Sequence, residues 1–97
     1  MPTVERLPRF NADWERLSDQ QRARFRVAVA AFVAHLAAGE SFRPGLRVKR
    51  VQATDDIWEL SWAPDGRATW QYGAEIRPDE PHVVWRRIGT HAIFRSP

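Results

Sequence analysis

The sequence predicts an α+β fold in which an N-terminal helical hairpin packs on one face of an antiparallel sheet of about four strands. Apolar side chains at Phe25, Val29, Phe32 and Leu36 recur at spacings of 4, 3 and 4, which is the period of a helix. From residue 46 onward apolar and polar residues alternate, which is the period of a strand. Helical segments followed by strand segments are typical of α+β proteins with the helices on one face of the sheet.

The N-terminal region predicts one strand and two helices. Residues 3–7 fit an extra edge strand at the N-terminus. Asn11 is a candidate N-cap for a first helix over residues 12–17, because acidic residues stand in its first turn. Ser18 and Gln21 match a capping box, so the second helix is expected to begin at Ser18.

Four strands are predicted after the helices, at residues 46–51, 57–63, 67–73 and 82–88. The sequence Pro-Asp-Gly at residues 64–66 is a turn signal, so the second and third strands should form a hairpin. The face of such a sheet that the helices leave uncovered can stay open to solvent or to a ligand. Functional residues are therefore expected on that face.

The composition is that of one small folded domain spanning residues 1–97. Five Trp, five Phe and one Tyr supply a bulky core, and the chain has no cysteine for disulfides or thiolate metal sites. Three scattered histidines argue against a structural metal, and no cofactor is expected. With no signal-peptide pattern and no apolar run of roughly 20 residues, we expect a cytoplasmic protein that does not bind membranes.

Basic residues are concentrated on the first predicted sheet strand and in the loop before it. Arg43, Arg47, Lys49 and Arg50 lie within eight residues, with no acid among them. Such a patch is able to meet a polyanion. A genome that favours arginine codons accounts for the number of arginines by itself, so the inference depends on their position.

Three stretches, "LRVKRVQ", "IWELSWAPDGRATWQYG" and "VVWRRIGTHAIF", carry a resemblance that covers residues 7–94. In this order they resemble the RelE/ParE superfamily of bacterial type II toxin–antitoxin toxins. The resemblance implies two N-terminal helices packed on a curved antiparallel sheet. RelE-like members cleave mRNA in the ribosomal A site, whereas ParE-like members poison DNA gyrase. A cognate antitoxin is then the expected partner, with operator DNA bound through the toxin–antitoxin complex.

Individual residues match the superfamily unevenly. RelE-like toxins place two basic residues, one apart, on the strand after the helices, and Arg47 and Lys49 look like that pair. The Gly-Thr-His-Ala word at residues 89–92 matches the members closest to YafQ, in which this histidine, here His91, is a catalytic acid/base. Glu59 stands where RelE carries an arginine on its central strand, and the further His and Asp residues of the YafQ branch are absent. The residue set is therefore that of neither branch.

Four residues, His91, Arg47, Lys49 and Arg86, are the candidate catalytic group for metal-free RNA cleavage. The reaction needs a base for the ribose 2′-hydroxyl, cations for the phosphorane and an acid for the leaving 5′-oxygen. Histidine exchanges protons near neutral pH, although a capping or surface role for His91 is the plainer alternative. Arg47 and Lys49 are expected on one strand face, gripping phosphate. Because neighbouring strand residues point to opposite faces, only one of Arg86 and Arg87 should serve the site, and Arg86 is favoured.

The candidates for substrate binding each have a plainer alternative. Tyr72 lies two residues after Trp70 and so shares its strand face, which favours core packing over stacking on a base. Phe94 fits base stacking and closure of the core equally well. His82 is expected to be exposed, and Glu59 to pair with a nearby cation. The full set of substrate-binding candidates is Arg50, Arg87, Tyr72, Phe94 and Arg43.

Two classes of function remain open at this point. The favoured one is a ribosome-dependent endoribonuclease that cleaves mRNA by attack of the 2′-hydroxyl on the scissile phosphate. The alternative is a non-enzymatic protein, either a ParE-like gyrase inhibitor or an inactive homologue that only binds its antitoxin. The Gly-Thr-His-Ala sequence at residues 89–92 favours the enzyme.

Overall fold

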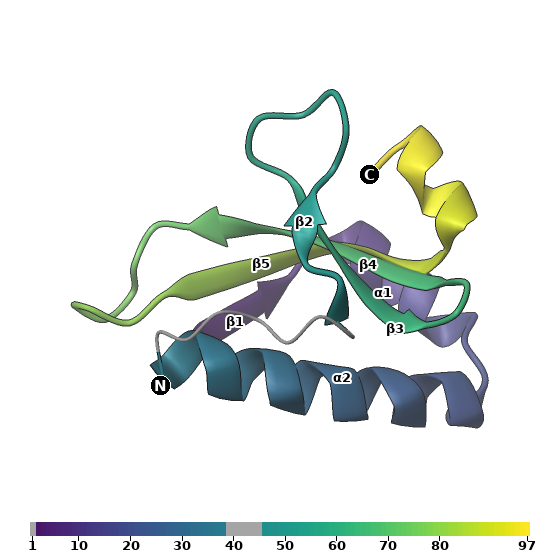
Figure 1. The fold of residues 1–97 in the computed structure, drawn as a ribbon, viewed down its shortest axis with the longest axis horizontal. Coiled ribbons are helices and arrows are strands. Elements are labelled where there is room, and N and C mark those ends of the chain that lie inside the picture. The colour runs from purple at the N-terminus through teal and green to yellow at the C-terminus, as the bar shows by residue number, and fades with distance from the viewer. Residues whose placement is uncertain (1, 39–45) are drawn as a thin grey trace.

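The computed structural model of the chain describes residues 2–38 and 46–97. Figure 1 shows two helices on one side of a twisted sheet and a last helical turn at the C-terminal end of the chain. The predicted α+β class is confirmed. In chain order the elements are β1 (Thr3–Arg6), α1 (Pro8–Glu15), α2 (Asp19–Ala38), β2 (Lys49–Arg50), β3 (Trp58–Ala63), β4 (Gly66–Gly73), β5 (His82–Thr90) and the 3-10 helix η2 (His91–Arg95).

The sheet has five strands in the order β1-β5-β4-β3-β2. β2 to β5 form the predicted antiparallel meander. β1 is the expected extra edge strand, but it runs parallel to β5, with Thr3 opposite His82 and Arg6 opposite Trp85. The sequence did not predict the direction of this edge strand, and its parallel pairing makes the five-stranded sheet mixed. Everything between β1 and β5 serves as the long crossover connection that a parallel pair requires.

The core lies between α2 and the sheet and is built mainly from aromatic rings. Phe32 contacts Trp70 edge to face, with ring centroids 4.9 Å apart. Phe25 contacts Trp85 in the same manner at 5.3 Å, and Phe10 of α1 joins both. Aromatic pairs at these separations contribute beyond the area they bury. The apolar stripe predicted for the second helix thus faces the sheet, and it fixes which face remains for function.

The two helix starts show one prediction confirmed and one wrong. The Ser18 amide donates to Gln21 Oε1 at 2.8 Å, and the Gln21 amide donates to Ser18 Oγ at 3.1 Å, which is the predicted capping box. α1 begins at Pro8 with Leu7 as its N-cap, so Asn11 lies inside the helix instead of capping it. Proline is favoured at the first helical position because its fixed φ and missing N–H cost nothing there.

The first predicted sheet strand is shorter than expected. Only Lys49 and Arg50 form a ladder with β3, opposite Glu59 and Trp58. Arg47 has φ 48°, in the left-handed region, so the expected alternation of Arg47 with Lys49 along one strand face is wrong. The physical reason lies one residue earlier, because Leu46 is 2% exposed and takes part in the core. The chain must turn out of the core before it can pair with β3.

The β3–β4 hairpin confirms the turn signal at residues 64–66. Ala63 pairs with Gly66 across the turn. A Cβ at Gly66 would stand 2.6 Å from two ring atoms of Trp62, so only glycine lets this ring lie against the strand. Within the described ranges no helix is long and apolar enough to cross a membrane.

His82 is buried, so the expectation of an exposed histidine is wrong. Its side chain bridges β1 and β5: Nδ1 lies 2.8 Å from Thr3 Oγ1, and Nε2 lies 2.8 Å from Glu5 Oε1. The parallel pairing of β1 places both partners beside the imidazole, and that pairing was not expected. Gly73 lies opposite His82 on β4, and a Cβ there would stand 2.7 Å from the ring. His82 therefore stabilises the fold by joining β1 to β5.

Candidate functional site

The face of the sheet opposite the helices carries Glu59 and Ser61 of β3 and Arg67, Thr69 and Gln71 of β4, and we call it the site face. Glu59 pairs with Thr69, and Ser61 pairs with Arg67. Directly paired residues share a face, and the neighbouring Leu60, Ala68 and Trp70 belong to the core cluster on the other side.

The site face is less open than the sequence suggested. Glu59 is only 7% exposed, and Thr69 is fully buried. One reason is η2, which folds back against β4 and β5. Ile93 of η2 is buried and lies against Gly89, where an added Cβ would stand 3.0 Å from its side chain. η2 therefore covers part of this face.

Both Arg86 and Arg87 lie on the site face, so the expectation that they point to opposite faces is wrong. Thr69 pairs with Arg87 and Trp70 pairs with Trp85, so β5 has one extra residue at Arg86. This is a β-bulge, which re-aims the side chains that follow it. Trp85 stays in the core and Arg87 takes the side of Thr69.

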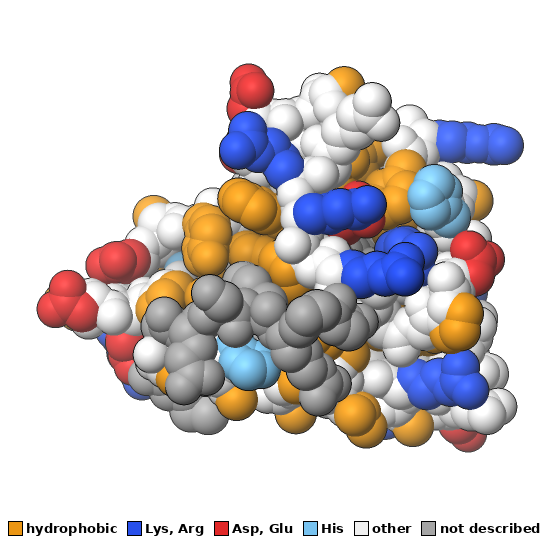
Figure 2. All heavy atoms as spheres, in the orientation of Figure 1, with side chains coloured by type: hydrophobic (Ala, Val, Ile, Leu, Met, Phe, Trp, Pro, Cys, Tyr) orange, Lys and Arg blue, Asp and Glu red, His pale blue; other side chains and the backbone are white. Residues whose placement is uncertain are grey.

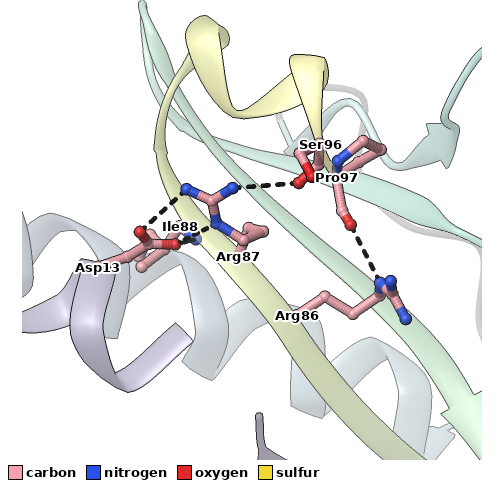
Figure 3. A network of polar contacts seen from close by, with 6 residues as sticks. All are labelled: Asp13, Arg86, Arg87, Ile88, Ser96 and Pro97. Atoms are coloured by element: carbon pink, nitrogen blue, oxygen red, sulfur yellow. Dashed lines mark hydrogen bonds and ion pairs between the residues drawn. The ribbon is translucent and has the colours of Figure 1, made fainter. Parts of the chain in front are cut away.

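Arg87 stabilises the fold through hydrogen bonds to other parts of the chain. Its Nε donates to Asp13 Oδ2 at 2.6 Å, and its Nη2 donates to Asp13 Oδ1 at 3.1 Å. Asp13 Oδ2 also accepts the Ile88 amide at 3.1 Å, and Arg87 Nη1 donates to the Ser96 carbonyl oxygen. Figure 3 shows this network joining α1, β5 and the end of the chain. The hydrogen bond with Asp13 raises the pKa of Arg87 further.

Arg86 has a different environment and keeps donors for a ligand. Its Nη1 donates to Gln71 Oε1 at 2.6 Å, and its Nε donates to the Pro97 main-chain oxygen at 3.2 Å. Figure 3 shows its side chain running toward Pro97, apart from the Asp13 pair. Gln71 therefore holds Arg86 over the site face, which is the position a phosphate-binding arginine needs.

Lys49 and Glu59 form a pair across β2 and β3. The Lys49 Nζ lies 3.8 Å from Glu59 Oε1, which confirms the expected pairing of Glu59 with a nearby cation. The lysine side chain is 69% exposed, so its charge faces solvent while the carboxylate beneath it is buried. Arg50 is exposed and stacks over the Trp58 ring at 5.7 Å. Arg47 is exposed as well.

His91 occupies the first position of η2, directly after β5, and is exposed. The Thr90 hydroxyl caps this helix by accepting the Ala92 amide at 3.3 Å. Phe94 contacts the imidazole edge to face, with centroids 4.6 Å apart and planes at 87°. Ile93, and not Phe94, is the buried residue of η2 that closes the core. Phe94 is half-buried beside His91.

Tyr72 is separated from this group. Its parity with Trp70 puts it on the helix side of the sheet, where its ring contacts Trp70 at 5.0 Å. The side chain is 49% exposed, so the expected core packing is only partial, and partial burial raises the pKa of Tyr72. Arg43 lies outside the described residues.

Thr69, Gln71 and Asp13 were missed by reasoning from the sequence. Thr69 and Gln71 alternate with Ala68 and Trp70, so the strand pattern itself placed them on the site face. No local pattern indicates Asp13, because its partner Arg87 is 74 residues away. Figure 2 shows Lys and Arg side chains over β2 and a histidine over η2 on one side of the molecule. Among the described residues no group of three or more His, Asp, Glu or Cys could hold a metal ion.

Two helices on a mixed five-stranded sheet with a terminal helical turn form the fold of the RelE-like toxins. No family model and no curated protein matches the chain in sequence. The structural likeness extends over nearly the whole chain.

Three solved structures illustrate this likeness. A chain of the Escherichia coli DinJ–YafQ complex has a TM-score of 0.65 and 14% identity, covering 95% of this chain and 96% of the other. A chain of the RelB–RelE antitoxin–toxin complex from Methanococcus jannaschii has a TM-score of 0.62 and 11% identity, covering 94% of each. A copper-bound mutant toxin from Helicobacter pylori has a TM-score of 0.63 and 14% identity, covering 95% and 97%. At these identities the likeness establishes the fold.

Proposed function

We propose that the chain is the toxin of a type II toxin–antitoxin system and acts as a ribosome-dependent, metal-free endoribonuclease. The observation that carries the proposal is the exposed His91 at the start of η2, beside a site face that presents the cations Lys49 and Arg86. Support comes from the fold, because structures of similar fold include the DinJ–YafQ and RelB–RelE complexes.

The cleavage chemistry follows from these residues. A base removes the proton of the ribose 2′-hydroxyl, and the 2′-oxygen forms a bond to the adjacent phosphorus. The bond from phosphorus to the 5′-oxygen breaks, and an acid protonates that oxygen, leaving a 2′,3′-cyclic phosphate and a 5′-hydroxyl. We assign one of the two proton transfers to His91. Phe94 limits the rotation of the imidazole through its edge contact.

The phosphorane gains negative charge that fixed cations stabilise. Arg86 is suited to this because Gln71 and the Pro97 oxygen hold its guanidinium in place. Lys49 adds a second charge, oriented by Glu59. Arg47 supplies a third from the segment before β2. Arg50 contributes to binding the RNA strand.

The cognate antitoxin and mRNA on the ribosome are the partners that this function requires, with operator DNA reached through the toxin–antitoxin complex. A net charge of +3 suits both an acidic protein segment and a polyanion. Coexpression with the antitoxin, sought among the products of the adjacent genes, should yield a stable complex. Failure of every adjacent gene product to bind the chain would count against the proposal.

Induced expression tests the enzymatic reading directly. We expect growth arrest and cleaved mRNA on ribosomes, and we expect His91→Ala to abolish both. His35→Ala, a histidine in α2 on the helix side, is the matched control and should remain toxic. Full toxicity of His91→Ala would remove the assigned role.

One observation favours the non-enzymatic alternative, a ParE-like gyrase inhibitor or an inactive antitoxin-binding homologue. Glu59 places a buried carboxylate beside Lys49 on the site face, and an anion there opposes a phosphate. Pulse-labelling of protein and DNA synthesis after induction separates the two. An early loss of DNA synthesis with protein synthesis intact would support the gyrase inhibitor.

A further inference from the structure

A groove of about 690 Å³ lies between α2 and the edge of β3, and Arg47 is the one member of the catalytic group assigned above that lines it. Its volume falls within the range of roughly 300–1,000 Å³ that is usual for ligand sites. Three arginines from separate parts of the chain line it: Arg24 of α2, Arg47 before β2 and Arg67 of β4. Ser61 and Trp62 of β3 lie between them.

The groove exists because β2 is so short. β2 pairs with Trp58 and Glu59 only, so the rest of this edge of β3 has no ladder partner in the part of the chain that the structure describes. Leu46 inserts into the core just before β2, and Arg47 has a left-handed backbone conformation, so these two residues do not extend the ladder along β3. The space left beside β3 opens toward α2.

The cations of the groove are largely without counter-charges. Within residues 2–38 and 46–97, the side chains of Arg24 and Arg47 make no hydrogen bond or ion pair. Arg67 Nη1 donates to carbonyl oxygens of the turn, at 2.9 Å for Gly66. Its Nε and Nη2 donate no hydrogen bond within the described residues. Like charges brought together without partners favour the binding of an anion.

The groove is continuous with the site face. Arg67 pairs with Ser61 on one side and with Gly89 on the other, so it stands in the row next to Glu59 and Thr69. Figure 2 shows Lys and Arg side chains following one another from β2 toward the N-terminal half of α2. At the far end, a smaller cavity of about 320 Å³ is lined by Asp65, whose charge disfavours an anion there.

We propose that this groove binds the phosphate backbone of the RNA strand beyond the scissile bond, with Arg24 and Arg67 as phosphate-binding residues. The proposal rests on the proposed function, because it assumes that the bound strand is single-stranded RNA entering from the site face. The strand passes from Lys49 and Arg47 around the edge of β3 to Arg24. The groove then sets affinity and its salt dependence, apart from the reacting atoms.

Binding of a 2′-O-methyl RNA oligonucleotide to the purified chain tests this, because such RNA lacks the nucleophile and stays intact. Fluorescence anisotropy at several salt concentrations gives the affinity and its salt slope. We expect Arg24→Ala to weaken binding roughly threefold and to reduce the slope by about 0.7, the amount for one phosphate contact on a single strand. Arg24→Glu should weaken binding more, and Arg24→Lys should restore the slope.

Arg77→Ala is the matched control, since this exposed arginine lies in the loop after β4, and it should leave affinity and slope unchanged. An unchanged slope for Arg24→Ala overturns the proposal, even if the wild-type chain cleaves mRNA on ribosomes. If Arg24→Ala and Arg24→Glu weaken only the antitoxin complex, the groove is a protein-docking surface and the proposal is wrong. If RNA binding shows the expected slopes but no mRNA is cut, the groove stands and the enzymatic proposal fails.

Discussion

Two regions of the molecule differ in how their polar and charged side chains are paired. Where β1, β5 and α1 meet, Arg87 is held by both oxygens of Asp13, and His82 is held by Thr3 and Glu5. On the side of β2 and η2, the cations are exposed and His91 faces solvent. Buried side chains with several polar partners hold elements together, whereas mostly exposed cations such as Lys49 remain available to a ligand. The contrast separates framework from function in a chain rich in arginine.

The largest effect on stability is expected from Asp13→Ala. Removing this carboxylate leaves Arg87 and the Ile88 amide without their partner in a largely buried position. Breaking a buried pair in this way costs about 3–5 kcal/mol of the free energy of unfolding. Urea denaturation measures this loss. Asp19→Ala is the control, because Asp19 is fully exposed and its ion pair with Arg22 is long, at 4.0 Å. Equal losses for the two variants would contradict the framework role.

A smaller loss is expected from His82→Ala. The substitution removes the bridge from β5 to Thr3 and Glu5 and leaves the Thr3 hydroxyl unpaired. Loss of buried hydrogen bonds of this kind costs about 1–3 kcal/mol of unfolding free energy. Hydrogen exchange should show that the β1 amides lose protection first. Uniform loss of protection across the sheet would mean that His82 does not act locally on β1.

Lys49→Ala should separate stability from activity. Its side chain is mostly exposed, so we expect a change of no more than about 1 kcal/mol in the free energy of unfolding. Cleavage of mRNA should nevertheless fall by about tenfold or more, because a cation facing the phosphorane is lost. A parallel melting curve and ribosome cleavage assay check both values. A variant that melts early but cleaves at the wild-type rate would assign Lys49 to the framework.

The smallest effect concerns Tyr72 and high pH. Partial burial raises the pKa of Tyr72 in the folded state. Its contribution to stability is therefore present below the unfolded value of about 10 and is lost as pH rises through the folded pKa. Tyr72 is the chain's single tyrosine, so tyrosinate absorbance reports its titration alone. Tyr72→Phe should remove this pH dependence and leave cleavage unchanged; reduced cleavage would place Tyr72 in the site.

Local signals in the sequence predicted the local structure well. The capping box at Ser18, the turn at residues 64–66 and the stripe through Phe32 each depend on residues a few positions apart. These interactions form within one element, so spacing alone reveals them. The place of His91 directly after the last predicted strand is also a local feature, whereas its role in proton transfer stays a prediction.

The features that escaped prediction depend on distant parts of the chain. The parallel pairing of β1 buries His82, and Asp13 is brought to Arg87 across 74 positions. The bulge at Arg86 changes the side of Arg87, and alternation counted along one strand cannot reveal an extra residue. Likewise, burial of Leu46 shortens β2 and leaves the groove beside β3. Tertiary packing decided each of these.

The central claim is that His91 performs proton transfer in RNA cleavage while the framework charges do not. Cleavage of a defined mRNA on purified ribosomes, followed by mapping of the new 5′ ends, tests it most directly. We predict that the wild-type chain cuts only when ribosomes are present and leaves 5′-hydroxyl ends. His91→Ala should be slower by about 100- to 10,000-fold with an unchanged unfolding curve. Cleavage by His91→Ala at the wild-type rate, or intact mRNA with the wild-type chain, would contradict the account.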